Sequence, residues 1–226
     1  MRTGPIAAVV VSILAAAACA HRADLIPGPP VSPSPLPQPH AGGYECTLLI
    51  GLGVTSEWFT PDFEKAVGDA RWQAVFRKGT FVQHWADPAH EAWSETIVSP
   101  CSKGSQAPDR VYFVTANWDF KTVEEWSEPL NRVVKTLETK FPSVKRIELM
   151  TVVRPPGNVS CGGAKSPVAP VVDEAIVKAS AAFPDLVRAA PRFELPSCDA
   201  FTNGGPHLTS EGGAQAARLV AAHYAN

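Results

Sequence analysis

Short apolar runs alternate with longer amphipathic segments along most of this chain. Five runs are rich in aliphatic, β-branched or aromatic residues, as buried parallel strands are, and they span residues 46–52, 72–77, 111–115, 146–153 and 192–196. Four segments carry helix signals instead, and they span residues 60–67, 122–140, 170–183 and 209–224. Strands that alternate with helices predict an α/β fold in which helices cover both faces of a parallel sheet.

Polar residues mark where two of these helices begin. Thr122 and Glu125 have the spacing of a capping box, and Thr209 stands in front of the last helix as an N-cap residue. Pro129 lies within the second helical segment, where a proline has no N–H to donate. We therefore expect the helix to restart or kink at Pro129.

The first part of the chain has the pattern of an export signal. Arg2 provides a positive charge, and residues 6–18 form an apolar stretch that is too short to span a bilayer comfortably. Cys19 follows a run of alanines, as in a bacterial lipobox. Residues 1–19 are therefore predicted to be a signal peptide with Cys19 as the lipidation site. Ordinary cleavage beside a nearby alanine is the alternative.

Composition divides the rest of the chain. Residues 20–43 are rich in proline and predict an extended tether, and residues 44–226 are expected to form the folded domain. Of the 226 residues, 45% are hydrophobic and 19% charged, and the net charge is −2. This balance gives no reason to expect nucleic acid or an anionic membrane surface as a partner. We expect an exported monomer of the bacterial cell envelope, either secreted or held at the membrane only by an N-terminal lipid anchor.

Four cysteines follow Cys19, and an even number in an exported chain favours disulfides. They are widely spaced and include no C-x-x-C pair, so we expect no metal site. Three pairings are possible. Cys46 and Cys101 precede predicted strands, whereas Cys161 and Cys198 follow predicted strands. Because each couple should lie at one end of the sheet, we favour the disulfides Cys46–Cys101 and Cys161–Cys198.

Three predicted strand ends and turns carry candidate chemistry. The first apolar run ends in a Gly-x-Gly turn at Gly53, and the third is followed closely by Asn117. His207 stands just before the last helix, in a Gly-Pro-His-Leu-Thr segment. In open α/β folds, ligands and catalytic groups lie at the carboxyl ends of the strands. The three clusters together have the pattern of an active site on a parallel sheet.

Taken together, these clusters resemble the SGNH (GDSL-like) hydrolase family. The family's first block, Gly-Asp-Ser-x-Thr, aligns with Gly51-Leu52-Gly53-Val54-Thr55. The first and last residues match, and Gly53 stands at the place of the nucleophilic serine. The resemblance covers most of the folded domain. It implies a flavodoxin-like, three-layer α/β/α sandwich with a five-stranded parallel sheet, and the cleavage of ester bonds.

The remaining blocks of the family give roles to further residues. Gly79 resembles the glycine whose backbone N–H helps to form the oxyanion hole, and Asn117 resembles the asparagine that donates from its side chain. His207 would be the general base. The acid of the family's Asp-x-x-His block is replaced by Gly204, so Asp199 is the nearest carboxylate that could orient the imidazole.

Gly53 has no side chain that could attack a carbonyl carbon, which leaves two functions open. In the first, the chain is an esterase or deacylase of the cell envelope that acts on a small-molecule or glycan ester, and Ser56, Thr55 or a water replaces the usual nucleophile. In the second, it is a catalytically inactive relative that binds a glycan, an acyl ligand or a partner protein. Ser56 also fits a plain helix-entry residue, and Gly79 a plain turn glycine.

Other candidate sites are less specific. Trp58, Trp85 and Trp118 fall near the predicted cleft, where they could stack on a sugar, although packing in the core is the favoured role. The Gly-x-Gly turn lacks the third glycine of a dinucleotide fingerprint, so we expect no cofactor. The histidine-containing stretch 84–90 fits no metal-ligand spacing.

Overall fold

The computed structural model describes residues 43–68, 71–101, 107–158, 161, 171–202 and 207–224. The predicted signal peptide, Cys19 and almost all of the predicted tether lie outside these residues. Among the helices that the described ranges contain, none has the length and apolar character needed to cross a membrane.

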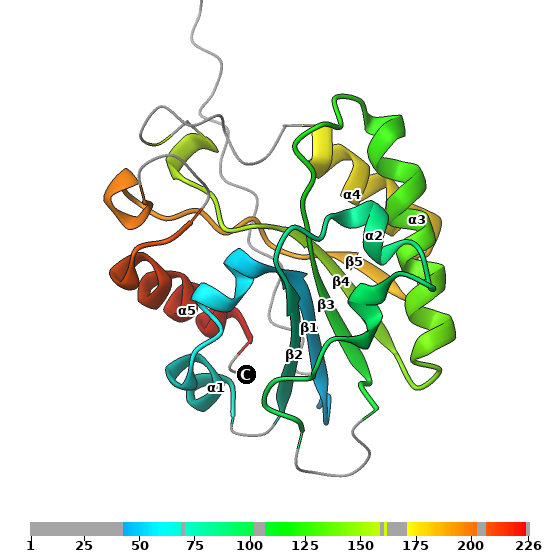
Figure 1. Cartoon of the computed structure of the whole chain (residues 1–226), viewed down its shortest axis with the longest axis horizontal. Helices are drawn as coiled ribbons and strands as arrows, with labels where there is room; N and C mark the ends of the chain where they lie inside the picture. Colours follow the sequence, from blue (N-terminus) through cyan, green and yellow to red (C-terminus); the bar gives the residue numbers. More distant parts are fainter. Residues whose placement is uncertain are drawn as a thin grey trace, which may run out of the picture. The chain divides into compact units, whose positions relative to one another are not determined.

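A parallel sheet of five strands forms the centre of the domain (Figure 1). Its strands are β1 (Thr47–Leu52), β2 (Trp72–Arg77), β3 (Arg110–Thr115), β4 (Arg146–Thr151) and β5 (Val187–Ala189). The order across the sheet is β2-β1-β3-β4-β5, and every pairing is parallel. This is the order of a flavodoxin-like doubly wound sheet. The predicted α/β fold with five parallel strands is therefore confirmed.

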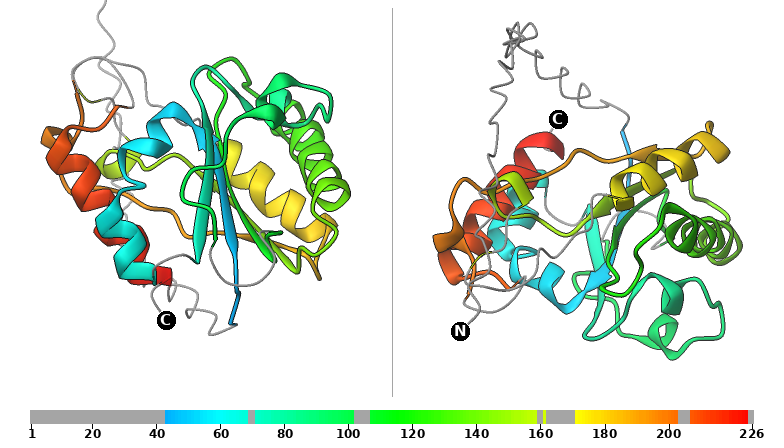
Figure 2. Two further views of the ribbon diagram at one scale, coloured as in Figure 1. Left: turned by 60° about the horizontal axis from the view of Figure 1, so that its bottom comes forward. Right: turned by 90° about the horizontal axis from the view of Figure 1, so that it is seen from above.

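Helices cover both faces of the sheet (Figure 2). The helices are α1 (Pro61–Val67), α2 (Val82–Trp85), α3 (Val123–Lys140), α4 (Val171–Ala182) and α5 (Ser210–Tyr224). Helices α1 and α5 pack together on one face, and α3 and α4 pack together on the other. Short 3₁₀ turns complete the chain: η1 (Gly53–Glu57), η2 (Glu91–Ser94), η3 (Pro156–Asn158) and η4 (Cys198–Ala200).

The fifth strand is not where the sequence predicted it. β5 spans Val187–Ala189, whereas residues 192–196 contribute only an isolated bridge between Arg154 and Glu194. β5 has three residues, of which only Val187 is buried, so it has no apolar run to reveal it. The run at 192–196 is apolar because Phe193 and Leu195 pack against the core from an extended connection.

The predicted helix starts are present. Thr122 and Glu125 form a reciprocal capping box, with donor–acceptor distances of 3.2 and 2.9 Å. The Thr209 hydroxyl accepts the N–H of Gly212 at 3.0 Å. The predicted restart or kink at Pro129 is wrong, because α3 continues through this buried proline. In a regular helix, an N–H at position 129 would bind the carbonyl of Glu125. Because Glu125 is an exposed residue, water can bind that carbonyl instead.

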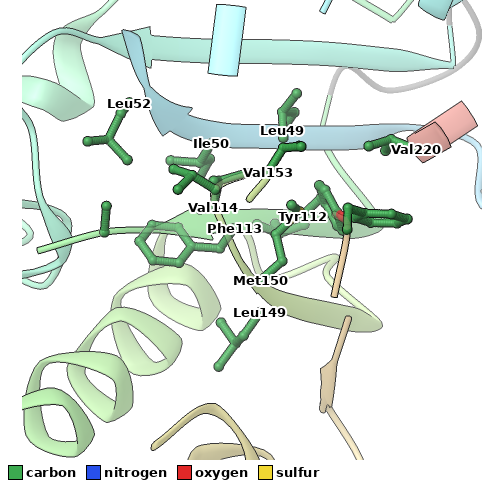
Figure 3. Packing of buried hydrophobic residues seen from close by; sticks show 14 of the residues in the cluster. Leu49, Ile50, Leu52, Tyr112, Phe113, Val114, Leu149, Met150, Val153 and Val220 are labelled. Atoms are coloured by element: carbon green, nitrogen blue, oxygen red, sulfur yellow. The ribbon is translucent and has the colours of Figure 1, made fainter. Parts of the chain in front are cut away.

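The core lies on both sides of the central strands (Figure 3). Leu49, Ile50 and Phe113 are fully buried, and all six residues of β1 and of β3 are buried. Trp58 and Trp85 are 2% and 1% exposed, so both belong to the core. Packing in the core was the favoured role for these two residues. Because both faces of the sheet are buried, side chains on both sides of each strand are mainly apolar. These strands therefore appear in the sequence as continuous apolar runs.

Two disulfides stabilise opposite ends of the sheet. Cys46 and Cys101 are joined just before β1, and Cys161 and Cys198 are joined beyond the carboxyl ends of the strands. The favoured pairing is confirmed. The bridges span 55 and 37 residues of chain, so each removes substantial freedom from the unfolded state.

Candidate active site

The carboxyl ends of β2, β1 and β3 lie next to one another, and each leads into a predicted site residue. Gly53 begins η1 directly after β1, Gly79 lies in the turn after β2, and Asn117 follows β3. β1 is the middle strand of the three. A Cβ placed on Gly53 would lie 3.5 Å from the Cα of Lys78, so the turn that contains Gly79 borders position 53.

Position 53 has room for a side chain. The contacts of a Cβ at Gly53 would be ordinary van der Waals contacts of 3.5 Å or more, and Gly53 does not have a positive φ. Gly51 differs, because a Cβ there would lie 2.4 Å from the hydroxyl oxygen of Thr55. The fold therefore requires glycine at position 51, where η1 folds back over β1, but does not require it at position 53.

Two hydroxyl side chains lie in η1, and neither is hydrogen-bonded to His207. Ser56 is exposed and donates its hydroxyl proton to the carbonyl of Gly53 at 2.6 Å. Thr55 is 1% exposed, and its hydroxyl oxygen has no hydrogen-bond partner in the described part of the chain. A nucleophilic hydroxyl needs a base within hydrogen-bond reach. Ser56 and Thr55 lack that arrangement in this structure.

His207 is paired with a carboxylate that the sequence analysis did not consider. Its Nδ1 lies 2.6 Å from Oε1 of Glu57, the last residue of η1. The other carboxylate oxygen of Glu57 accepts the backbone N–H of Leu208, also at 2.6 Å. A carboxylate that accepts from Nδ1–H fixes the imidazole in the tautomer whose Nε2 can accept a proton.

Asp199 does not take the predicted role of orienting acid in this structure. It lies in η4, where its carboxylate accepts the hydroxyl proton of Ser197 at 2.9 Å and its own N–H is bound by the same hydroxyl. Within the described residues, it makes no hydrogen bond to His207. The physical reason is that Glu57 already occupies Nδ1. The available sequence signal was an acid shortly after the first block, four positions after Gly53.

Close backbone packing holds the His207–Glu57 pair together. A Cβ on Gly213 of α5 would lie 2.4 Å from the carbonyl oxygen of Glu57, and one on Gly212 would lie 1.9 Å from the carbonyl oxygen of Ala200. These two glycines let the first turn of α5 press against η1 and η4. The backbone of His207 is also bound, because its carbonyl accepts the N–H of Thr202 at 2.8 Å.

Asn117 is held rigidly. Its side chain is buried at 5% exposure, and its Oδ1 accepts the backbone N–H groups of Asp119 and Phe120 at 2.7 and 3.1 Å. Its Nδ2 donates one hydrogen to Oε1 of Gln83 at 2.8 Å. Among the residues that the structure describes, no acceptor takes the second hydrogen of Nδ2, which leaves it for a ligand. A fixed neutral donor of this kind suits the stabilisation of a developing negative charge.

Gly79 has a backbone conformation that favours glycine. Its φ is +72°, and the space around a Cβ at this position is empty. The conformation rather than crowding therefore explains the glycine. The turn is tied to the end of β3, because the N–H of Val82 binds the carbonyl of Ala116 at 3.2 Å.

The histidines of the stretch 84–90 are stacked and serve as acceptors. The rings of His84 and His90 lie 4.8 Å apart and nearly parallel. Nδ1 of His84 accepts the N–H of Phe81, and Nδ1 of His90 accepts the N–H of Ala92. In the part of the chain that the structure describes, no three His, Cys, Asp or Glu side chains are grouped to hold a metal ion.

A groove of about 370 Å³ runs between α1 and α5 and begins at Glu57. Its lining combines Phe63 and several alanines with the charged side chains of Asp62 and Arg218. Arg218 is paired with Glu211 on the same helix. The groove gives Glu57 a polar and partly open surrounding on the side of α1.

Comparison with solved structures identifies the fold. The chain matches a carbohydrate esterase family 2 enzyme with a carbohydrate binding domain from Corynascus thermopiles (Myceliophthora fergusii), with a TM-score of 0.52 and 12% identity over 86% of this chain and 68% of that chain. It also matches a candidate platelet activating factor from Streptococcus pneumonia, with a TM-score of 0.55 and 15% identity over 83% and 87% of the two chains. No family model matches the sequence, and the search of curated proteins found no match.

A further solved structure in the comparison is a candidate GDSL-like lipase from Parabacteroides merdae, with a TM-score of 0.46 and 13% identity over 80% of this chain and 95% of that chain. These neighbours are all of the SGNH/GDSL type. At such identities the likeness establishes the fold alone, and it rests on the two structures with TM-scores above 0.5. The domain therefore has the α/β fold of the SGNH hydrolases.

Proposed function

We propose that this protein is an exported ester hydrolase of the SGNH fold that uses water, activated by the His207–Glu57 pair, in place of a serine nucleophile. The observation that carries this proposal is the carboxylate of Glu57, which binds both Nδ1 of His207 and the N–H of Leu208 at 2.6 Å. This arrangement holds the imidazole in one tautomer, with Nε2 as the acceptor nitrogen. A general base needs this tautomer.

The proposed reaction uses His207, which precedes α5, together with Asn117 and Gly79, which follow β3 and β2. Nε2 of His207 takes a proton from a water, and the resulting hydroxide attacks the carbonyl carbon of the ester. The oxygen that becomes negative accepts hydrogen bonds from the Nδ2 hydrogen of Asn117 that is not bound to Gln83 and from the N–H of Gly79. The tetrahedral intermediate then expels the alkoxide, which takes the proton back from the imidazolium. The products are a carboxylic acid and an alcohol.

The setting of the proposed activity is the bacterial cell envelope. The predicted signal peptide with Cys19 supports export, either as a lipoprotein or as a secreted protein. The two disulfides support it independently, because such bridges persist in oxidising compartments. The carbohydrate esterase among the structural neighbours supports a small-molecule or glycan ester as the substrate.

A second function is favoured by the glycine at position 53. Without a hydroxyl at the end of β1, the same site would bind an ester or acyl group and not cleave it. This alternative keeps Asn117 and Gly79 as donors to a bound carbonyl oxygen. It makes His207 a hydrogen-bonding residue rather than a base.

Hydrolysis of a short-chain acyl ester by the purified protein separates the two functions. Activity that falls sharply in His207→Ala and persists in Ser56→Ala supports the water mechanism. Activity that is lost in Ser56→Ala instead would identify Ser56 as the nucleophile. If the wild-type protein is silent and Gly53→Ser hydrolyses the ester, the hydrolase proposal is overturned in favour of binding. The fit of a Cβ at position 53 makes that gain of function structurally feasible.

A further inference from the structure

One of the six tryptophans differs from the others in its exposure. Trp118 is 38% exposed, whereas Trp58, Trp72, Trp85 and Trp126 are all 2% exposed or less. Trp93 is partly buried and packs against the core. More than a third of Trp118 stays exposed, so part of its ring is available to a ligand.

The ring of Trp118 is held in place by its neighbours. Its backbone lies in the turn that the Oδ1 of Asn117 closes through the N–H groups of the two residues that follow Trp118. Nζ of Lys121 donates to the carbonyl of Trp118 at 2.5 Å. Phe81 packs edge to face with the indole, with ring centroids 6.2 Å apart and an interplanar angle of 82°. A ring fixed in this way loses little freedom when a ligand stacks on it.

Trp118 also stands beside the proposed oxyanion donors. It directly follows Asn117 in the chain, and its packing partner Phe81 comes two positions after Gly79. The indole therefore belongs to the turn that contains Asn117 and contacts the segment that follows Gly79. This is the side of the proposed site on which a group attached to the ester could reach the ring.

The surroundings of the ring favour a sugar over an alkyl chain. The exposed face of an indole is electron-rich and attracts the polarised C–H groups on the flat side of a pyranose. Hydroxyl groups around the sugar need polar partners, and Gln83 is partly exposed while Asp119 and Lys121 are exposed beside the ring. An alkyl chain would need apolar walls instead.

We propose that Trp118 is a stacking platform for a neutral sugar ring, and that the substrate is an O-acylated carbohydrate. This inference rests on the proposed function, which supplies the ester bond that is cleaved. It adds the identity of the group attached to that ester, a sugar ring. Of the three tryptophans that could either pack in the core or stack on a sugar, Trp58 and Trp85 lie in the core and Trp118 does not.

Steady-state kinetics with three acetyl esters tests the platform. The esters are methyl 6-O-acetyl-β-D-glucopyranoside, cyclohexyl acetate, which has a ring without hydroxyls, and ethyl acetate. In Trp118→Ala we expect kcat/KM for the sugar ester to fall about tenfold, mainly through KM, with the other two esters unchanged. Trp118→Phe keeps a ring and should retain most of the preference. Leu219→Ala removes an equally exposed apolar side chain from α5 and should change nothing.

Failure of the platform and failure of the hydrolase proposal give different results. If all three esters are hydrolysed and Trp118→Ala affects them equally, the platform is overturned while hydrolysis stands. If no ester is hydrolysed, saturation-transfer NMR with the same sugar ester decides. Signals from the sugar C–H groups that depend on Trp118 support the platform without catalysis. Equal signals in wild type and Trp118→Ala, or none in either, overturn it.

Discussion

The two ends of the sheet use charged residues in opposite ways. At the amino end, Arg110 is 7% exposed and donates to the hydroxyl of Thr47 at 2.9 Å. The rings of Tyr44, Trp72 and Tyr224 surround its guanidinium at 4.7–5.1 Å. At the carboxyl end, His207 is 54% exposed beside Glu57. The Arg110 cluster at the amino end is enclosed by aromatic rings, whereas the His207–Glu57 pair at the carboxyl end is open to a ligand.

The enclosed cluster also keeps its neighbours neutral. Glu148 lies 3.7 Å from Arg110 and accepts the hydroxyl proton of Tyr224 at 2.5 Å. Burial raises the pKa of Tyr112 and of Tyr224 well above the ordinary value, so both stay protonated. The carboxylate of Glu148 therefore contacts both the guanidinium of Arg110 and the hydroxyl of Tyr224 within a packed cluster. The difference indicates that one end of the sheet serves stability and the other serves ligand chemistry.

Removal of the guanidinium should give the largest effect on the fold. Arg110→Ala leaves the Glu148 carboxylate buried without its cation, and we expect a loss of about 3–5 kcal/mol of unfolding free energy. Urea denaturation measures it. Combining Arg110→Met with Glu148→Leu should recover much of the loss, because no charge is then left unpaired. Equal losses in the single and double variants would show that packing of the rings, and not the charge, carries the effect.

The matching change at the carboxyl end should alter activity and not the fold. Glu57→Gln removes the charge that supports the imidazole, and we expect kcat/KM for a short-chain ester to fall about 100-fold. Asp199→Asn is the matched control, since that carboxylate contacts Ser197, and it should stay within about twofold of wild type. A larger loss in Asp199→Asn than in Glu57→Gln would return the orienting role to Asp199.

Two glycine-to-alanine variants at the carboxyl end of the sheet show which glycine the packing requires. In Gly213→Ala the new Cβ meets the carbonyl oxygen of Glu57, so α5 must move away from η1. We expect a loss of about 1–3 kcal/mol in unfolding free energy and a weaker His207–Glu57 pair. In Gly53→Ala the new Cβ makes only ordinary contacts, and stability should stay within about 1 kcal/mol of wild type. Equal losses in urea denaturation would contradict the distinction.

The strands were predictable where most or all residues of a strand are buried. The strands 72–77 and 111–115 agree with β2 and β3 to within one residue, because buried parallel strands leave unbroken apolar runs. β5 was missed because a short edge strand with one buried residue leaves no such run. The disulfides were predictable because strand direction alone assigns each cysteine to an end of the sheet.

The candidate site was only partly predictable, because its central contact joins distant segments. Glu57 and His207 are 150 residues apart in the chain, and they meet only when the glycines of α5 pack against η1. The sequence pointed to Asp199 since it is near His207 in the chain. Nearness in sequence does not show which side of a loop a carboxylate faces. Gly53, Gly79 and Asn117 were placed correctly at strand ends because strand ends follow from periodicity.

The smallest expected effect concerns the stacked histidines near the carboxyl edge. Burial, and then the nearby His90, lower the pKa of His84 below its ordinary value of 6.5. The folded state therefore binds fewer protons at this site than the unfolded state, so this contribution to stability is present above pH 6.5 and is lost as the pH falls through the folded pKa. Protonation would also turn the Nδ1 that accepts the N–H of Phe81 into a donor. A thermal melt series from about pH 7.5 to about pH 5 should show this decrease.

His90→Asn isolates the contribution of the second ring. An asparagine oxygen can still accept the N–H of Ala92, as Nδ1 of His90 does, because asparagine is a good N-cap residue. The variant thus keeps the local hydrogen bond but removes the neighbouring positive charge that would form at low pH. We expect its melting temperature to fall less than that of the wild type over the same pH range. An identical pH dependence in the two proteins would show that burial alone, and not the pairing of the rings, sets the behaviour of His84.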